Sequence, residues 1–162
     1  MDTFVAWVRA TTLSRTINQT VWIWPLCETL HFIGLSLLIG VVGFFDLRLM
    51  GFFRRVPIAA ARELVPFAVA GFLLNLTTGL IFLTALPEQY AHNVAWWFKV
   101  GFLGLAGLNA LLFETVVSRR IVNLAVGDDT PRIAKVIGLM SLLSWFGVLY
   151  WGRMLPFIGG AF

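Results

Sequence analysis

Residues 21–45 read VWIWPLCETLHFIGLSLLIGVVGFF, and this stretch decides the fold. Glu28 is its only formally charged residue. A helix needs roughly 20 apolar residues to cross the hydrocarbon core of a bilayer, which is about 30 Å thick. The stretch is long enough for such a crossing, and it does not alternate with the period of two that marks a strand of a membrane barrel. It therefore predicts a transmembrane helix.

Three further runs have the same character, at 64–86, 95–117 and 134–157. In lipid, only helices and closed barrels satisfy every backbone polar group. Because none of the runs has barrel periodicity, we expect an all-α integral membrane protein built as a bundle of four transmembrane helices.

The composition supports this class of protein. Of the 162 residues, 59% are hydrophobic and 12% are charged, and the mean hydropathy is +0.88. A soluble domain of this size cannot hide that much apolar surface, which excludes a soluble enzyme, a disordered tail and a disulfide scaffold. The single cysteine, Cys27, allows no internal disulfide and is expected to be a small buried hydrophobe. The expected partner is the lipid bilayer. Nucleic acid is not expected, because the sequence has no basic run interleaved with aromatic residues.

The first 20 residues differ from the rest. Apolar residues at helical spacing stand among polar neighbours, which predicts an amphipathic helix lying in the membrane interface. The spacing is that of Phe4, Val5, Trp7 and Val8. The chain thus divides into an interfacial helix, 1–20, and a four-helix transmembrane domain, 21–162.

Basic residues predict the orientation. The segments after the first and third runs are rich in Lys and Arg, whereas 87–94, after the second run, contains neither. By the positive-inside rule, the first and third loops lie in the cytoplasm and both termini lie outside. In a bacterium this means the inner membrane, with both termini periplasmic. The basic residues concerned are Arg48, Arg54, Arg55, Arg62, Arg119, Arg120, Arg132 and Lys135.

Polar side chains within the apolar runs are candidates for function, because charge at membrane depth is costly. At a rise of about 1.5 Å per residue, His31 falls near the bilayer midplane, with Glu28 one turn above it on the same helix face. Asn75 and Thr78 fall within about a turn of the same level. Lys99 and Arg153 lie closer to the outer surface, whereas Glu114 lies at the cytoplasmic end.

Several roles for His31 remain open: a haem or metal ligand, a proton carrier, or a hydrogen-bond partner between helices. A dinuclear metal site is disfavoured, because the other acid within the runs, Glu114, is half a bilayer away. A single imidazole can serve as an axial haem ligand, and Lys99 and Arg153 can pair with propionates. Alternatively, Glu28 forms a buried ion pair with one of those cations.

Glycines and the remaining acid also carry expectations. Glycines along the second and third runs, such as Gly79 and Gly101, either leave room for a flat macrocycle or let helices pack closely; packing is favoured for Gly101, Gly104 and Gly107. Glu114 is expected to pair with Arg119 or Arg120.

The stretch Trp24–Gly34 followed by Asp46–Gly51 resembles an uncharacterised family of small bacterial four-helix membrane proteins. The resemblance continues through Thr78-Gly79 and Lys99. More distantly, the order of a His in the first helix, Thr-Gly in the second and a Lys opening the third is similar to the CopD copper-resistance domain and the HemJ protoporphyrinogen oxidase group. The HemJ resemblance implies haem or porphyrin binding through His31, with Lys99 also important. Glu114 stands where many relatives have a second His, which leaves five-coordinate haem, a His/Lys arrangement or no cofactor.

Three functions follow as hypotheses. The first is an inner-membrane protein that binds haem b or a porphyrin, with His31 as the metal ligand and Glu28, Lys99, Arg153, Asn75 and Thr78 around the cofactor, and that takes part in membrane redox chemistry. The second is a non-enzymatic structural or accessory subunit, as a homo-oligomer or within a larger membrane complex. The third is a copper or proton transport element of the CopD type, in which Cys27 shares a helix face with His31.

Overall fold

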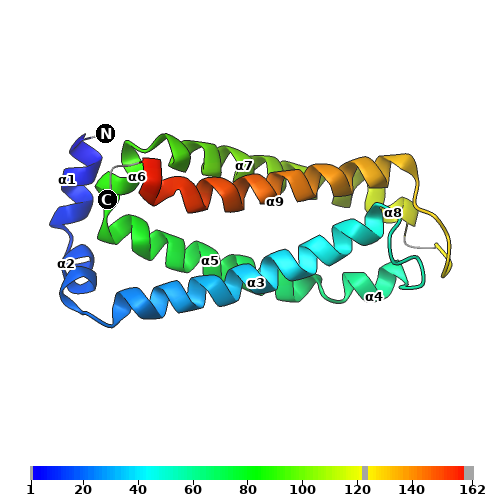
Figure 1. Cartoon of the computed structure of the whole chain (residues 1–162), viewed down its shortest axis with the longest axis horizontal. Coiled ribbons are helices and arrows are strands. Elements are labelled where there is room, and N and C mark those ends of the chain that lie inside the picture. The colour runs from blue at the N-terminus through cyan, green and yellow to red at the C-terminus, as the bar shows by residue number, and fades with distance from the viewer. Residues whose placement is uncertain (1, 122–123, 159–162) are drawn as a thin grey trace.

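The computed structural model describes residues 2–121 and 124–158, and all the regular structure in those residues is helical (Figure 1). The outer limits predicted for the two segments, residues 1 and 162, lie outside the described residues. The helices are α1 (Asp2–Ala10), α2 (Thr12–Gln19), α3 (Ile23–Leu49), α4 (Ile58–Arg62), α5 (Val65–Ala85), α6 (Pro87–Ala91), α7 (Val94–Leu112), a π-helical turn η1 (Phe113–Val117), α8 (Ser118–Ile121) and α9 (Arg132–Ile158).

The long helices form two antiparallel hairpins. α3 packs mainly along α5, and α7 packs mainly along α9. Glycines allow the close approach within the first hairpin: a Cβ on Gly71 would lie 2.7 Å from the backbone oxygen of Gly34. In the second hairpin, Asn93 caps α7 by accepting from the Ala95 N–H at 2.9 Å, and its amide donates to the Leu155 carbonyl of α9 at 2.8 Å.

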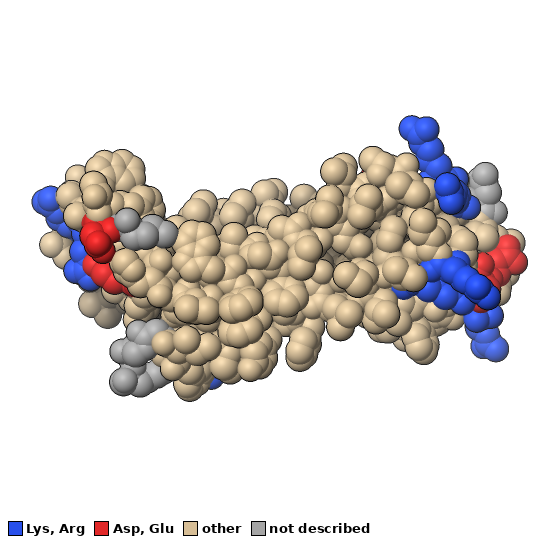
Figure 2. Space-filling model, turned by 90° about the horizontal axis from the view of Figure 1, so that it is seen from above, with Lys and Arg blue, Asp and Glu red and all other residues tan. Residues whose placement is uncertain are grey.

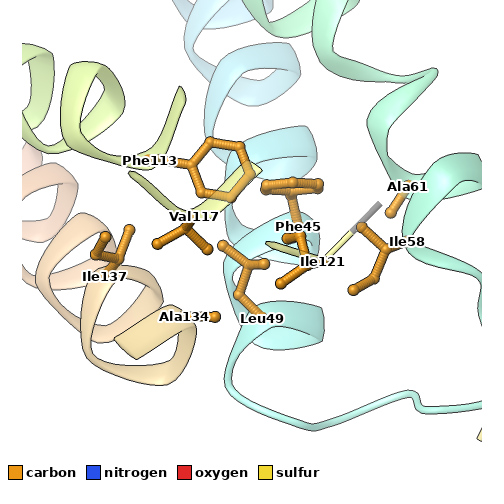
Figure 3. Close-up of a cluster of buried hydrophobic side chains, with 9 residues drawn as sticks. All are labelled: Phe45, Leu49, Ile58, Ala61, Phe113, Val117, Ile121, Ala134 and Ile137. Atoms are coloured by element: carbon orange, nitrogen blue, oxygen red, sulfur yellow. The ribbon is translucent and has the colours of Figure 1, made fainter. Parts of the chain in front are cut away.

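The two hairpins meet at one end of the bundle, which we call the basic end because it carries Arg54 and Arg55 of the segment 50–57 and Lys135 in the first turn of α9. There α3 and α9 cross so closely that a Cβ on Gly138 would lie 2.8 Å from the Asp46 carbonyl oxygen. The buried core gathers at this end (Figure 3). Its residues are Phe45, Leu49, Ile58, Ala61, Phe113, Val117, Ile121, Ala134 and Ile137.

The opposite end, which we call the cavity end, carries α1, α2, α6 and the last turns of α9 (Figure 1). α3 and α9 are in contact, but α5 and α7 do not pack along each other even though only α6 separates them in the chain. The hairpins are therefore joined at the basic end and separated at the cavity end.

One face of the molecule shows an apolar belt between two charged ends. On the face drawn in Figure 2, the Lys, Arg, Asp and Glu side chains gather at the two ends, and other residues fill the band between them. The spans Ile23–Leu49, Ile58–Ala85, Val94–Ile121 and Arg132–Ile158 are long and apolar enough to cross a membrane. The predicted four-helix bundle is confirmed at this level, with the third helix continuing through η1 and α8 beyond the predicted end at 117.

The N-terminal segment differs from the prediction, because it forms two helices instead of one. The chain breaks at Thr11, whose hydroxyl donates to the Val8 carbonyl at 2.6 Å and accepts from the Ser14 N–H at 3.2 Å. This hydroxyl ends α1 and caps α2, as Ser and Thr do at helix starts. Val5, Val8 and Ile17 are buried, while Phe4 and Trp7 remain exposed.

Charged groups at the basic end are paired differently from the prediction. Glu114 accepts from Arg62 through both carboxylate oxygens, at 2.8 and 3.0 Å, and not from Arg119 or Arg120. Arg62 also donates to the Ser118 hydroxyl at 2.5 Å. The contact requires α4 to fold back against η1, a tertiary arrangement that spacing within the third run does not reveal.

Candidate functional site

A cavity of about 790 Å³ opens between the two hairpins at the cavity end. Its volume is within the range of small-molecule sites in proteins, about 300–1,000 Å³. α3, α5, α6, α7 and α9 all contribute to its walls. Of the six residues predicted to surround a cofactor, five line this cavity: Glu28, His31, Asn75, Lys99 and Arg153.

Thr78, the sixth, is buried behind His31 and determines how the imidazole is held. Its Oγ1 lies 2.7 Å from His31 Nδ1 and 2.8 Å from the Leu74 carbonyl oxygen. A hydroxyl has one proton, and a carbonyl can only accept. Both contacts are hydrogen bonds when Thr78 donates to Leu74 and His31 Nδ1–H donates to Thr78. In that tautomer, Nε2 carries a free lone pair.

Nε2 is the ring nitrogen available to a ligand. His31 lines the cavity, and Nδ1 is already bonded to Thr78. Within residues 2–121 and 124–158, Nε2 makes no hydrogen bond. One side of the ring contacts Phe82, with the ring centroids 5.6 Å apart. The hydrogen bond between His31 and Thr78 confirms the prediction that these two residues lie at the same depth.

Glu28 is exposed at the cavity wall and makes no ion pair with Lys99 or Arg153. Its Oε1 accepts from the indole N–H of Trp24 at 3.1 Å, one turn earlier on α3. The alternative of a buried ion pair is therefore wrong for this structure. The hairpins stand apart here, so the acid on α3 and the cations on α7 and α9 face each other across the cavity without contact.

The two cations approach the cavity from the second hairpin. Lys99 lies against Gly152 of α9, where a Cβ would be 3.6 Å from its Nζ, and its ammonium is 5.9 Å from the centroid of the Trp96 ring. Arg153 is exposed, with its guanidinium carbon 5.2 Å from the centroid of the Phe157 ring. Neither side chain pairs with a carboxylate in the described part of the chain.

Asn75 joins the cavity wall to the packing of the first hairpin. Its amide nitrogen donates to the Gly71 carbonyl at 2.9 Å, and a Cβ on Gly34 would lie 2.6 Å from that nitrogen. Its Oδ1 is buried and has no partner in the described residues. Gly34 and Gly71 therefore serve helix packing, while Gly79 borders the cavity.

The glycines of α7 neither pack against another helix nor border the cavity. A Cβ on Gly101, Gly104 or Gly107 would meet nothing within 4 Å, and none of them lines the cavity. The packing expected at these positions is absent from the described chain. They lie on the face of α7 that points away from α9.

Aromatic side chains form much of the wall, and sequence reasoning missed their role. Trp24, Phe82, Tyr90, Trp96 and Trp145 all line the cavity. Trp145 had a usable signal, because it lies in the middle of its apolar run, away from the interface where Trp residues usually gather. Tyr90 packs edge-on against Trp96, and burial raises its pKa to about 12, so the phenol is neutral.

Side chains that commonly bind a bare metal ion do not cluster in the described part of the chain. No group of three or more His, Cys, Asp or Glu that could hold one exists within residues 2–121 and 124–158. Cys27 is buried as predicted, but it does not line the cavity with His31. Copper sites favour sulfur and imidazole ligands together, and that combination does not occur here.

Comparison with protein-family models, with curated proteins and with solved structures finds no match for this chain. The resemblances drawn from Trp24–Gly34, Thr78-Gly79 and Lys99 thus stay expectations, and the function has to be argued from the cavity itself.

Proposed function

We propose that this chain is a multi-pass membrane protein that binds haem b or a porphyrin in the cavity between its hairpins, with His31 as the axial ligand to iron. The observation that carries the proposal is the Thr78 contact, because it orients the ring and leaves Nε2 as the free donor atom. Ligand histidines in proteins generally donate their other ring N–H in this way.

The cavity also matches the shape and polarity of such a cofactor. Its walls are largely aromatic and aliphatic, which suits a flat macrocycle. Among the described residues, Lys99 and Arg153 offer two cations without carboxylate partners, and propionate groups supply two negative charges. Because both cations come from the second hairpin near the cavity end, they support an orientation in which the acidic edge of the cofactor points to that end.

The residues have separable tasks. His31 donates the lone pair of Nε2, Thr78 keeps the proton on Nδ1, and the aromatic wall excludes water. Haem, when bound, supplies one-electron transfer, whose potential depends on the axial ligand and its hydrogen bonds.

The apolar belt and the charge distribution support a place in the bacterial inner membrane. Under the positive-inside rule, the basic end is cytoplasmic and the cavity end is periplasmic. The cavity then lies in the outer half of the bilayer, with α6 and the N-terminal helices at the membrane surface.

The test is the visible spectrum of the protein purified in detergent and titrated with haem b. We expect a Soret band, and we expect His31→Ala to weaken binding at least tenfold. His92→Ala is the matched control, because His92 is the other histidine, is exposed and lies outside the cavity. Absence of a Soret band in haem-saturated wild-type protein, or equal binding by His31→Ala, would refute the proposal.

A further inference from the structure

A second, smaller hollow lies between α3 and α9, with a volume of about 330 Å³. Every residue that lines it is apolar: Ile39, Val42, Gly43, Leu142, Leu143, Trp145, Phe146 and Leu149. We call it the α3/α9 groove. Gly43 has open space where a Cβ would be, so the groove is hollow partly because this position lacks a side chain.

The groove shares part of its wall with the main cavity. Trp145 and Leu149 line both hollows. Along α3, the cavity is lined up to Leu38 and the groove begins at Ile39. The two therefore adjoin between α3 and α9, just before these helices close on each other at Gly138.

The combined site has opposite chemistry at its two ends. Arg153 and Lys99 lie toward the cavity end, whereas Leu142 on α9 is about 16 Å further along the helix axis at the usual rise per residue. Positive charge is thus at one end and an apolar wall at the other, with His31 between them. A ligand that fits this gradient has acidic groups on one edge and a long apolar chain on the opposite edge.

We propose that the ligand of this protein carries a hydrocarbon chain, and that the chain lies in the α3/α9 groove while the ring occupies the cavity. This inference rests on the proposed porphyrin function and deepens it by naming the ligand class, a porphyrin with an isoprenoid substituent. The groove lies at the depth of the apolar belt, where water is not available to fill it, and the indole N–H of Trp145 is the one polar side-chain group among its lining residues. Its position beside the cavity, with Trp145 and Leu149 in both walls, favours the ligand's own chain over a separate lipid chain.

The experiment compares two porphyrins that differ in one substituent. Haem b has vinyl groups, and haem o has a hydroxyethylfarnesyl chain in place of one of them. Gly43→Leu fills the groove, and Gly40→Leu is the matched control, because Gly40 also has open space at the Cβ position but does not line the groove. Both changes replace a poor helix former with a good one, so both variants should fold.

We expect Gly43→Leu to weaken haem o binding by about tenfold, as overpacking of a filled site does, while haem b binding changes less than twofold. Gly40→Leu should change neither. If Gly43→Leu leaves haem o binding unchanged, or weakens the binding of both haems equally, the proposal that the chain lies in the groove is wrong. The proposed porphyrin site would not be affected by that result. If wild-type protein binds neither haem, both proposals fail. Retained haem b binding also reports that the variant is folded.

Discussion

In the contact between His31 and Thr78, the position of one hydroxyl proton determines which imidazole nitrogen is free. Thr78 accepts from the imidazole because its own proton goes to Leu74, and that fixes which ring nitrogen is free. Buried Thr hydroxyls on helices often bond the carbonyl one turn back. Here that common local bond has a consequence on another helix, since it turns the hydroxyl into an acceptor for α3.

Thr78→Val should therefore weaken haem binding without removing the ligand. Valine keeps the shape but offers no acceptor, so Nδ1–H is left unpaired and the tautomer is no longer fixed. Loss of such an outer partner typically costs about 10–100-fold in metal affinity. Haem titration gives the affinity, and the iron–histidine stretching frequency reports the altered basicity of the ligand.

Thr78→Ser serves as the control, because it restores the hydroxyl on nearly the same backbone position. Serine should recover most of the affinity and the original frequency. If Thr78→Val and Thr78→Ser behave alike in both measurements, the hydroxyl does not set the state of His31.

At this scale the sequence predicts depth well and pairing poorly. Counting along α3 and α5 places His31 and Thr78 at one level, because a helix advances by a constant rise. The same counting left Glu28 opposite the cations, yet its carboxylate bonds Trp24 on its own helix. Pairing depends on the distance between two helices, and the spacing of residues along one helix does not predict that distance.

Among the elements, the hairpin is the unit of packing. Gly34 and Gly71 bring α3 and α5 together, and a close contact of Gly147 with the Phe102 ring joins α9 to α7. The glycines of α7 recur every three residues, at 101, 104 and 107, but face open space. A run of small residues thus predicts that another helix can pack closely at that position. Whether a helix does so depends on how the first helix is rotated in the bundle.

α6 is held over the cavity by the N-terminal helices. Glu88 of α6 forms an ion pair with Arg9 of α1, and Asp2 of α1 lies 3.2 Å from His92. α6 also contributes Gln89 and Tyr90 to the cavity wall. The attachment of α1 should therefore influence how freely a ligand enters.

This attachment should depend on pH. The hydrogen bond from Arg9 lowers the pKa of Glu88 below its ordinary value of 4.5. A lowered pKa in the docked state means that the ion pair contributes fully above pH 4.5 and is lost as the pH falls through the docked-state value. Hydrogen exchange of the α1 amides should accelerate, after correction for intrinsic rates, as the pH drops below about 4.5.

Glu88→Gln is the variant that isolates this effect. It should show the faster exchange already at neutral pH, and salt should change it less than wild type, because the exposed pair is screened. α3 amides provide the internal reference. Identical exchange of α1 in wild type and Glu88→Gln at neutral pH would show that the ion pair does not hold the helix.

For the whole molecule, the important asymmetry is between a packed end and an open end. The core in Figure 3 gathers at the basic end, and the cavity occupies the other. The hairpins pack directly on each other at the basic end, whereas at the cavity end α6 lies between them, in contact with both α5 and α9. The apolar runs predict four helices, but they do not predict this asymmetry, because it comes from which side chains meet at the crossing of α3 and α9.

The charge asymmetry leads to a prediction about orientation. Eight basic residues from the first and third loops lie at or near the basic end, so this end should face the cytoplasm. Cys27 is the only native thiol and is buried, so single exposed cysteines can be introduced with little background after Cys27→Ala. Gln19→Cys marks the cavity end, and Val126→Cys, at a side chain 63% exposed, marks the basic end.

A maleimide that cannot cross membranes should label Gln19→Cys in cells whose outer membrane has been made permeable. It should label Val126→Cys only after the inner membrane is opened. The four crossings require the two positions to lie on opposite sides, since α3, with one crossing, separates the N-terminal helices from the basic end. Labelling of both from the same side would contradict the multi-pass arrangement itself. A reversed pattern would keep the crossings but place the cavity in the cytoplasmic half, where a ligand would enter from the inner leaflet.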